Sequence, residues 1–334
     1  MLGVALSGSF HPAFLLALAL SAPVAPAAVD PGALAAPIPG QSLAREAALD
    51  EPLFDRLTSP RLSAASSDSS ARFRRDESGR VVPVLHAAAA IIYNPETREV
   101  LWAENEDATR SIASITKVMT AIVLLDHEPD LSREVVVDAA DLRRASTTFL
   151  RRNERLALDT LLHLTLIASD NGAARVLART SIFGTEGFVE QMNRKALELG
   201  LGNSRFADPS GLDERNVSTA YDIARLIAFA SADERIGSLM RQERHRIETN
   251  RRAFVVRNTN RLLGTDLDIR AGKTGFIREA GYCLATLVRL PEGAKVAVVV
   301  LGAPSNRGRF SEARNLFDWI TRQVSEFIVT DNEP

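Results

Sequence analysis

The order in which strand-like and helix-like stretches follow one another is the feature that most constrains the fold of this chain of 334 residues. Two strand-like runs, at 87–93 and 99–103, flank the turn signal Asn94-Pro95-Glu96-Thr97, which predicts a hairpin. A mostly helical stretch follows from about 111 to 230, and its clearest helices are expected at 115–126, 158–168, 171–179 and 188–198.

Strand patterns return only late in the chain, at 252–257, 269–273, 282–289 and 296–302. An amphipathic helix at 310–327 follows them, and its apolar stripe is typical of a helix packed on a sheet. This order predicts an α/β (α+β) fold in which one sheet takes strands from both chain ends, with a helical insertion between them.

Residues 1–27 have the composition of a secretory signal peptide. They contain no Asp, Glu, Lys or Arg, and their apolar run at 13–20 is too short to span a bilayer. Ala25-Pro26-Ala27 supplies small residues at the cleavage positions, although a basic start is missing. The pattern favours export to the periplasm over the alternative of a buried N-terminal helix.

The rest of the chain divides by composition. Residues 28–83 are rich in Ala, Pro and Ser and predict a flexible leader, because such a segment buries little apolar surface. Compact structure is expected at 84–328, and 329–334 form a short tail.

Charge and cysteine content exclude several classes of protein. The chain has 40 Lys and Arg against 42 Asp and Glu, so no basic excess indicates a nucleic-acid partner. Cys283 is the only cysteine, which excludes an intrachain disulfide and a cysteine-based zinc cluster. The sequence contains no HExxH motif, so it gives little support to a metal-dependent hydrolase. Acidic residues in and after the 310–327 helix argue against a stable membrane anchor.

The first chemical motif is Ser114-Ile115-Thr116-Lys117, which opens an apolar helix. Positions i and i+3 share one face of a helix, so the serine hydroxyl and the lysine amine can meet. A buried lysine near other cations can serve as the base that a serine nucleophile needs. Alone the motif is weak, because a serine at a helix start is often only a cap.

Two further motifs follow. Ser169-Asp170-Asn171 lies at the junction of two expected helices, where capping is the simpler interpretation. Lys273-Thr274-Gly275 ends an expected strand and sets a cation beside a hydroxyl, with a glycine that allows close approach.

The conjunction of the three motifs is more specific than any one of them. S-x-x-K, S-x-N and K-T-G occur in this order, 55 (169−114) and then 104 (273−169) residues apart. The chain resembles the penicillin-recognising serine D-alanyl-D-alanine peptidases, the low-molecular-mass penicillin-binding proteins, over about residues 84–325. The resemblance implies a β-lactamase/DD-peptidase-like fold with an antiparallel sheet and 84–328 as the catalytic domain.

Other stretches narrow the branch. Residues 110–121, 206–212 and 216–220 look like the low-molecular-mass peptidases, and 272–276 with 280–284 are similar to the D-alanyl-D-alanine endopeptidase branch (penicillin-binding protein 7). The 61 residues (334−273) after Lys273 are too few for the extra C-terminal domain and anchor of the carboxypeptidase branch. The second motif is less decisive: with Asp170 in the middle and Gly172 after Asn171, where many carboxypeptidases read S-G-N-D, it departs slightly from both branches. An endopeptidase is expected, with a carboxypeptidase as the alternative.

Two further alternatives stay open. A class A β-lactamase would need an E-x-x-L-N loop, and 198–202, the nearest candidate, has Gly202 where the Asn should stand. A non-catalytic wall-binding protein is disfavoured because all three motifs are intact.

The resemblance also implies roles for individual residues. Ser114 is the expected nucleophile, Lys117 its base and Ser169 the group that passes a proton to the leaving amine. Peptidoglycan peptides are the expected substrates and β-lactams the expected covalent inhibitors at Ser114, with no metal and no organic cofactor.

The expected substrate-binding residues are Asn171, Lys273, Thr274, Gly275 and Phe276. Asn171 would bind the substrate backbone and orient Lys117. Lys273 and Thr274 would hold an acidic group of the substrate. The backbone N–H groups of Ser114 and Phe276 would form an oxyanion hole.

Overall fold

The computed structural model describes residues 73–75, 77 and 79–331. The expected signal peptide at 1–27 and most of the expected leader lie outside these residues. In the described part of the chain, no helix is both long enough and apolar enough to cross a membrane.

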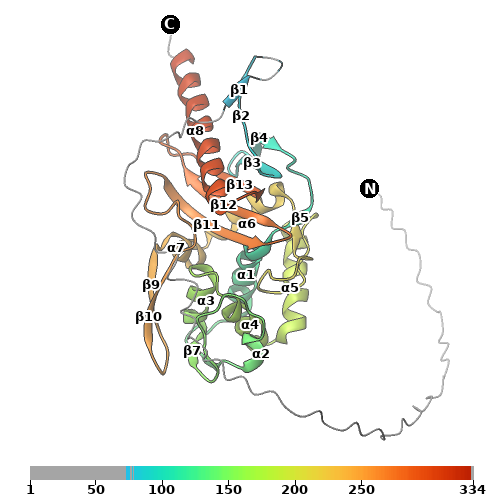
Figure 1. Ribbon diagram of the computed structural model, residues 1–334, viewed down its shortest axis with the longest axis vertical. Coiled ribbons are helices and arrows are strands. Elements are labelled where there is room, and N and C mark those ends of the chain that lie inside the picture. The colour runs from blue at the N-terminus through green and yellow to red at the C-terminus, as the bar shows by residue number, and fades with distance from the viewer. Residues whose placement is uncertain (1–72, 76, 78, 332–334) are drawn as a thin grey trace, which may run out of the picture. The chain divides into compact units, whose positions relative to one another are not determined.

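A five-stranded antiparallel sheet forms the centre of the described unit, as Figure 1 shows. Its strands run in the order β11 (Asp268–Ile277), β12 (Gly281–Arg289), β13 (Lys295–Ala303), β3 (Ala89–Asn94) and β4 (Glu99–Glu104). The early hairpin and the late strands join where β13 pairs with β3, with Val299 opposite Ile91. The prediction of one sheet built from both chain ends is therefore confirmed.

Helices cover both faces of this sheet. The described helices are α1 (Lys117–His127), α2 (Ala139–Leu142), α3 (Leu158–Leu166), α4 (Asn171–Thr180), α5 (Gly184–Glu198), α6 (Ala220–Ala232), α7 (Glu234–Arg241) and α8 (Asn306–Asp331). The helix α8 packs on one face, whereas α6 and the rest of the helical insertion lie on the other (Figure 1).

Alternation along the strands divides the apolar side chains between two cores. Ile91 and Val299 face the helical insertion, whereas Ile92 and Val298 pack with α8 residues such as Leu316. Successive side chains of a strand point to opposite faces, so a strand that is apolar on both faces must be covered by helices on both sides.

Short strand pairs complete the fold. They are β5 (Arg110–Ser111) with β8 (Val217–Ser218), β6 (Glu134–Val136) with β7 (Arg155–Ala157), and β9 (Arg244–Glu248) with β10 (Ala253–Arg257). The strand expected at 252–257 is thus β10. It lies outside the central sheet because the neighbouring run β9 pairs with it as a local hairpin.

The structure also differs from the expected boundaries. Strands β1 (Phe73–Arg75) and β2 (Val81–Pro83) form a hairpin inside the segment expected as a leader. Trp319 Nε1 donates to the Val81 carbonyl at 2.7 Å, and the Arg322 guanidinium lies over the Phe73 ring. At the other end α8 continues to Asp331, beyond the expected domain end at 328.

Candidate active site

The first motif begins in a tight turn before it enters a helix. Residues Ala113–Thr116 form a 3₁₀ turn, and Lys117 is the first residue of α1. Lys117 Nζ donates to Ser114 Oγ at 2.9 Å. The serine is half-buried and the lysine is fully buried, so the amine faces the hydroxyl away from bulk water.

The Lys117 amine has two further acceptors. Nζ donates to Asn171 Oδ1 at 2.6 Å and to the Ser210 carbonyl at 2.5 Å. Burial lowers the pKa of Lys117 to about 7, against the opposing effect of the Asp208 and Asp170 carboxylates. An amine with such a pKa is available as a free base near neutral pH.

The second and third motifs together supply another hydroxyl–amine contact. Lys273 Nζ donates to Ser169 Oγ at 2.7 Å and to the Thr274 carbonyl at 2.9 Å. Burial, followed by the nearby Lys117 and Arg309 cations, holds the pKa of Lys273 well below its usual value. Ser169 has a left-handed backbone, with φ of +59°, in the connection between α3 and α4.

Asp170 and Asn171 anchor this connection. Asp170 is the N-cap of α4, and its carboxylate accepts from the backbone N–H groups of Ala173 at 2.8 Å and Phe149 at 2.5 Å. The Asn171 amide nitrogen donates to the Ala145 carbonyl at 2.7 Å, which turns its oxygen toward Lys117. The capping interpretation of the motif is thus right for Asp170, while the residues on either side of it contact the two lysines.

The K-T-G motif lies inside β11, which continues to Ile277 instead of ending at Lys273. A Cβ atom at Gly275 would lie 2.7 Å from the Ile112 carbonyl oxygen and 3.2 Å from the Ser114 nitrogen, so the strand runs directly against the serine turn. Thr274 Oγ1 donates to Thr259 Oγ1 at 2.6 Å. Phe276 is half-exposed, and its ring stacks on Tyr282.

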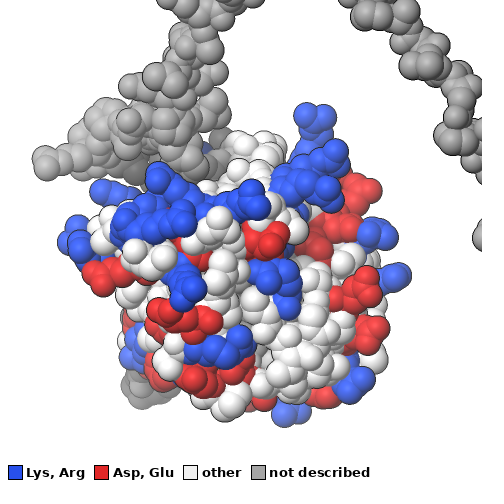
Figure 2. Space-filling model, turned by 90° about the horizontal axis from the view of Figure 1, so that it is seen from below, with Lys and Arg blue, Asp and Glu red and all other residues white. Residues whose placement is uncertain are grey.

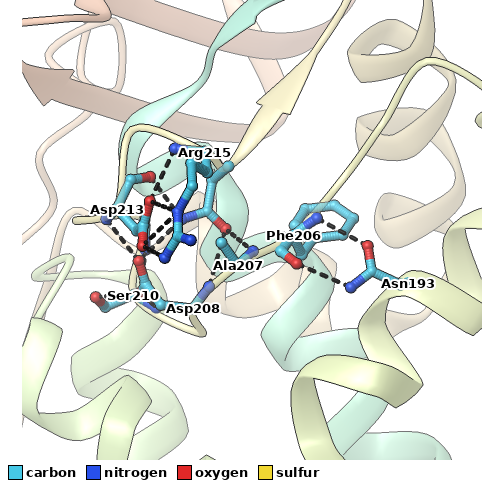
Figure 3. Close-up of polar contacts among 9 residues, drawn as sticks. Asn193, Phe206, Ala207, Asp208, Ser210, Asp213 and Arg215 are labelled. Carbon is cyan, nitrogen blue, oxygen red and sulfur yellow. Dashed lines mark hydrogen bonds and ion pairs between the residues drawn. The ribbon is translucent and has the colours of Figure 1, made fainter. Parts of the chain in front are cut away.

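Sequence reasoning gave no role to two features of this site. Arg309 of α8 is buried and donates to the carbonyls of Gly275 at 2.9 Å and Cys283 at 3.2 Å. The loop 206–216, part of which Figure 3 shows, supplies the Ser210 carbonyl to Lys117. The segment Asp208-Pro209-Ser210-Gly211 consists of residues common in turns, but a backbone carbonyl has no side-chain signature in a sequence.

The structure therefore brings the three motifs together around two hydroxyl–amine pairs. Ser114 with Lys117, and Ser169 with Lys273, each combine a potential nucleophile or proton carrier with a buried amine. Gly275 and Phe276 lie on the strand beside the serine turn. Such an arrangement suits acyl transfer.

Comparison with known proteins agrees with this geometry. The family described as D-alanyl-D-alanine carboxypeptidase matches residues 77–305. A D-alanyl-D-alanine endopeptidase of Escherichia coli is 34% identical over 243 residues, which cover 71% of this chain and 78% of that protein. D-alanyl-D-alanine carboxypeptidase DacF of Bacillus subtilis is 30% identical, with 75% of this chain and 66% of that protein covered.

Solved structures show the same fold. A Streptomyces DD-transpeptidase superposes with a TM-score of 0.68 at 26% identity, covering 71% of this chain and 97% of the other. Because the family match spans more than half of the sequence, this chain belongs to the D-alanyl-D-alanine carboxypeptidase family of serine peptidases.

Proposed function

We propose that this chain is a serine D-alanyl-D-alanine endopeptidase that cleaves peptide cross-links of peptidoglycan through an acyl-enzyme on Ser114. The observation that carries the proposal is the 2.9 Å contact between Ser114 Oγ and the buried Lys117 amine, whose pKa is about 7. The motif residues Ser114, Lys117, Ser169, Asn171, Lys273, Thr274, Gly275 and Phe276 form the proposed site.

Acylation begins with proton transfer. The neutral Lys117 amine takes the proton of Ser114 Oγ as the oxygen attacks the carbonyl carbon of a D-alanine residue. The backbone N–H groups of Ser114 and Phe276 stabilise the negative charge that develops on the carbonyl oxygen. The close passage of Gly275 beside the Ser114 nitrogen supports this assignment.

Collapse of the tetrahedral intermediate breaks the peptide bond. Ser169 passes to the leaving amine the proton that Lys117 took from Ser114, so Lys117 is neutral again after acylation, and Lys273 tunes Ser169 through their 2.7 Å hydrogen bond. A water molecule then hydrolyses the ester on Ser114, which releases the D-alanine carboxylate and restores the serine hydroxyl.

Three groups hold the substrate. Asn171 binds the peptide backbone while it orients Lys117, and Lys273 with Thr274 holds the carboxylate of the residue on the leaving side. β-Lactams imitate the D-alanyl-D-alanine end and acylate Ser114.

We favour an endopeptidase over a carboxypeptidase because the relatives named endopeptidase match this chain over more of their length. Three proteins named D-alanyl-D-alanine endopeptidase are 30–34% identical to this chain, and it covers 78–79% of their length. The proteins named carboxypeptidase are 28–30% identical, and it covers 62–66% of theirs.

We propose the periplasm as the site of action, with 1–27 as a signal peptide, 28–83 as the leader, 84–328 as the catalytic domain and 329–334 as the tail. The apolar, uncharged run at the start of the chain supports this location. The β1–β2 hairpin joins the catalytic domain through the contact of Trp319 with Val81.

The test is incubation with purified cross-linked peptide dimers and with pentapeptide monomers, followed by separation of the products. Dimers should become monomers, with slow release of terminal D-alanine, and a Ser114→Ala protein should do neither. Rapid D-alanine release with intact dimers would assign the protein to the carboxypeptidases, and rapid turnover of penicillin without peptide cleavage would indicate a β-lactamase.

A further inference from the structure

The loop 206–216 touches both members of the Ser114–Lys117 pair without supplying any motif residue. Its Ser210 carbonyl accepts from Lys117 Nζ at 2.5 Å. Gly211, with φ of +80°, lies so close to the serine turn that a Cβ atom there would stand 2.0 Å from the Ala113 carbonyl oxygen. The shape of this loop therefore decides where the lysine amine and the serine turn can lie.

One side chain holds the loop in that shape. Asp208 Oδ1 accepts from Ser210 N at 2.5 Å, Ser210 Oγ at 2.6 Å and Gly211 N at 2.9 Å. Asp208 Oδ2 accepts from Asp213 N at 2.6 Å and Asn216 Nδ2 at 2.9 Å. Figure 3 shows Asp208 and Ser210 next to Asp213 and Arg215 in this network. An ionised carboxylate can accept this many hydrogen bonds, whereas a neutral amide cannot, because half of it donates.

Asp208 also belongs to the set of charges that surround Lys117. Asp170 at the start of α4 and Asp208 favour the ammonium form, while Arg175 of α4 opposes it, and the buried Lys273 of β11 lies close enough for the two lysines to repel each other. Of the two carboxylates, Asp208 has the larger effect on Lys117.

We propose that Asp208 is a positioning residue for Lys117. Its carboxylate fixes the loop that presents the Ser210 carbonyl to Lys117 Nζ. Its negative charge favours the protonated form of the buried amine. The inference rests on the proposed function, because it assigns Asp208 to the base of that reaction.

The experiment compares the pH dependence of penicillin acylation in the wild-type, Asp208→Asn and Asp213→Asn proteins. Asparagine keeps the shape and one acceptor but removes the charge, so the amine loses its proton at lower pH. We expect the acid limb of the rate profile to move down by about one pH unit and the plateau rate to fall. Asp213→Asn is the matched control, because the Asp213 carboxylate pairs with the exposed Arg215. The acid limb of this variant's rate profile should stay at the wild-type pH.

An Asp208→Glu protein separates charge from geometry. It keeps the charge on a longer side chain, so acylation should slow while the acid limb stays near the wild-type position. If the acid limb of the acylation profile stays in place in Asp208→Asn, the proposed effect of the Asp208 charge is wrong. Wild-type acylation rates in Asp208→Glu would contradict the proposed positioning of Lys117 by Asp208. If Asp208→Asn does not fold, as judged by its thermal unfolding, Asp208→Glu still decides the second point. Absence of acylation in the wild-type protein would instead refute the proposed function.

Discussion

At the scale of single residues, the site contains two buried lysines that form no direct ion pair among the described residues. Among the described residues, neither Lys117 nor Lys273 forms an ion pair with a carboxylate; each donates to a serine hydroxyl and to backbone or amide oxygens. Burial disfavours the charged form of an amine. The burial that makes Lys117 costly for folding also suits its proposed role as a base.

The pH dependence of acylation tests this. Lys117 must be neutral to accept a proton, so with a pKa of about 7 the rate of penicillin acylation should rise as the pH increases through neutrality and fall below it. Lys117→Arg keeps a cation that stays protonated, and acylation should drop by about 10² or more. Lys195→Arg, at an ion-paired surface lysine, is the control and should match the wild type. An acylation rate that is constant from about pH 5 to about pH 9, two units on either side of this pKa, would contradict the role of Lys117.

How far the sequence predicts such residues depends on the kind of group involved. The pairing of Ser114 with Lys117 follows from their spacing, and it survives although a 3₁₀ turn replaces the first turn of the expected helix. The Ser210 carbonyl and the Arg309 guanidinium reach the site only through tertiary packing. No local pattern could have indicated either one.

At the scale of secondary-structure elements, the critical contact is the one between β11 and the 3₁₀ turn that carries Ser114. The strand can approach only because position 275 has no side chain: the nearest atoms to a Cβ there are the Ile112 carbonyl oxygen and atoms of Ala113 and Ser114. Backbone atoms cannot give way as a flexible side chain would, so this contact fixes the distance between the K-T-G strand and the serine.

Gly275→Ala should therefore separate the two elements. We expect it to lower the free energy of unfolding by about 1–3 kcal/mol and to slow penicillin acylation, because the backbone N–H groups beside Ser114 move apart. The control is Gly202→Ala, at an exposed position with open space around the added methyl group. Thermal unfolding and acylation kinetics of both proteins provide the measurement, and unchanged acylation in Gly275→Ala would argue against the close approach.

Most elements were predictable because their periodicity is strong, but their partners were not. The strand at 253–257 has the right pattern for the central sheet, yet it pairs with β9 because that neighbour is only a short turn away. The β1–β2 hairpin was hidden in a leader rich in small and polar residues, and the contact that fixes it comes from Trp319, 238 residues further along the chain. Such distant contacts leave no trace in a local pattern.

At the scale of the whole molecule, charge is distributed unevenly. The segment 143–155 carries exposed arginines at positions 143, 144, 151, 152 and 155, while Glu154, its only carboxylate, is buried and paired with Arg252. This segment also supplies the Thr147 and Ala145 carbonyls that bond Asn171, so it adjoins the site. Figure 2, seen from the lower end of Figure 1, shows Lys and Arg side chains gathered along one side of that face.

We expect these arginines to attract the carboxylates of the polymeric wall. Cleavage of intact peptidoglycan should slow as salt is raised from about 50 mM to about 500 mM, because salt screens exposed charges, while penicillin acylation changes little. Arg151→Glu with Arg152→Glu should reproduce the slow cleavage at low salt. Arg194→Glu with Arg205→Glu, at exposed positions outside this segment, is the matched control. Equal cleavage by both double variants would refute the effect.

The pairing of β13 with β3 has a consequence for how the protein reaches its native state. Ala297 lies opposite Tyr93, 204 (297−93) residues earlier in the chain. The β3 edge of the early β3–β4 hairpin therefore stays unpaired until β13 has been synthesised, and an exposed edge of this kind readily pairs with other chains. Folding that waits for such distant contacts is slow. A ribosome stalled before residue 295 would hold a chain with an open strand edge, a natural target for a chaperone.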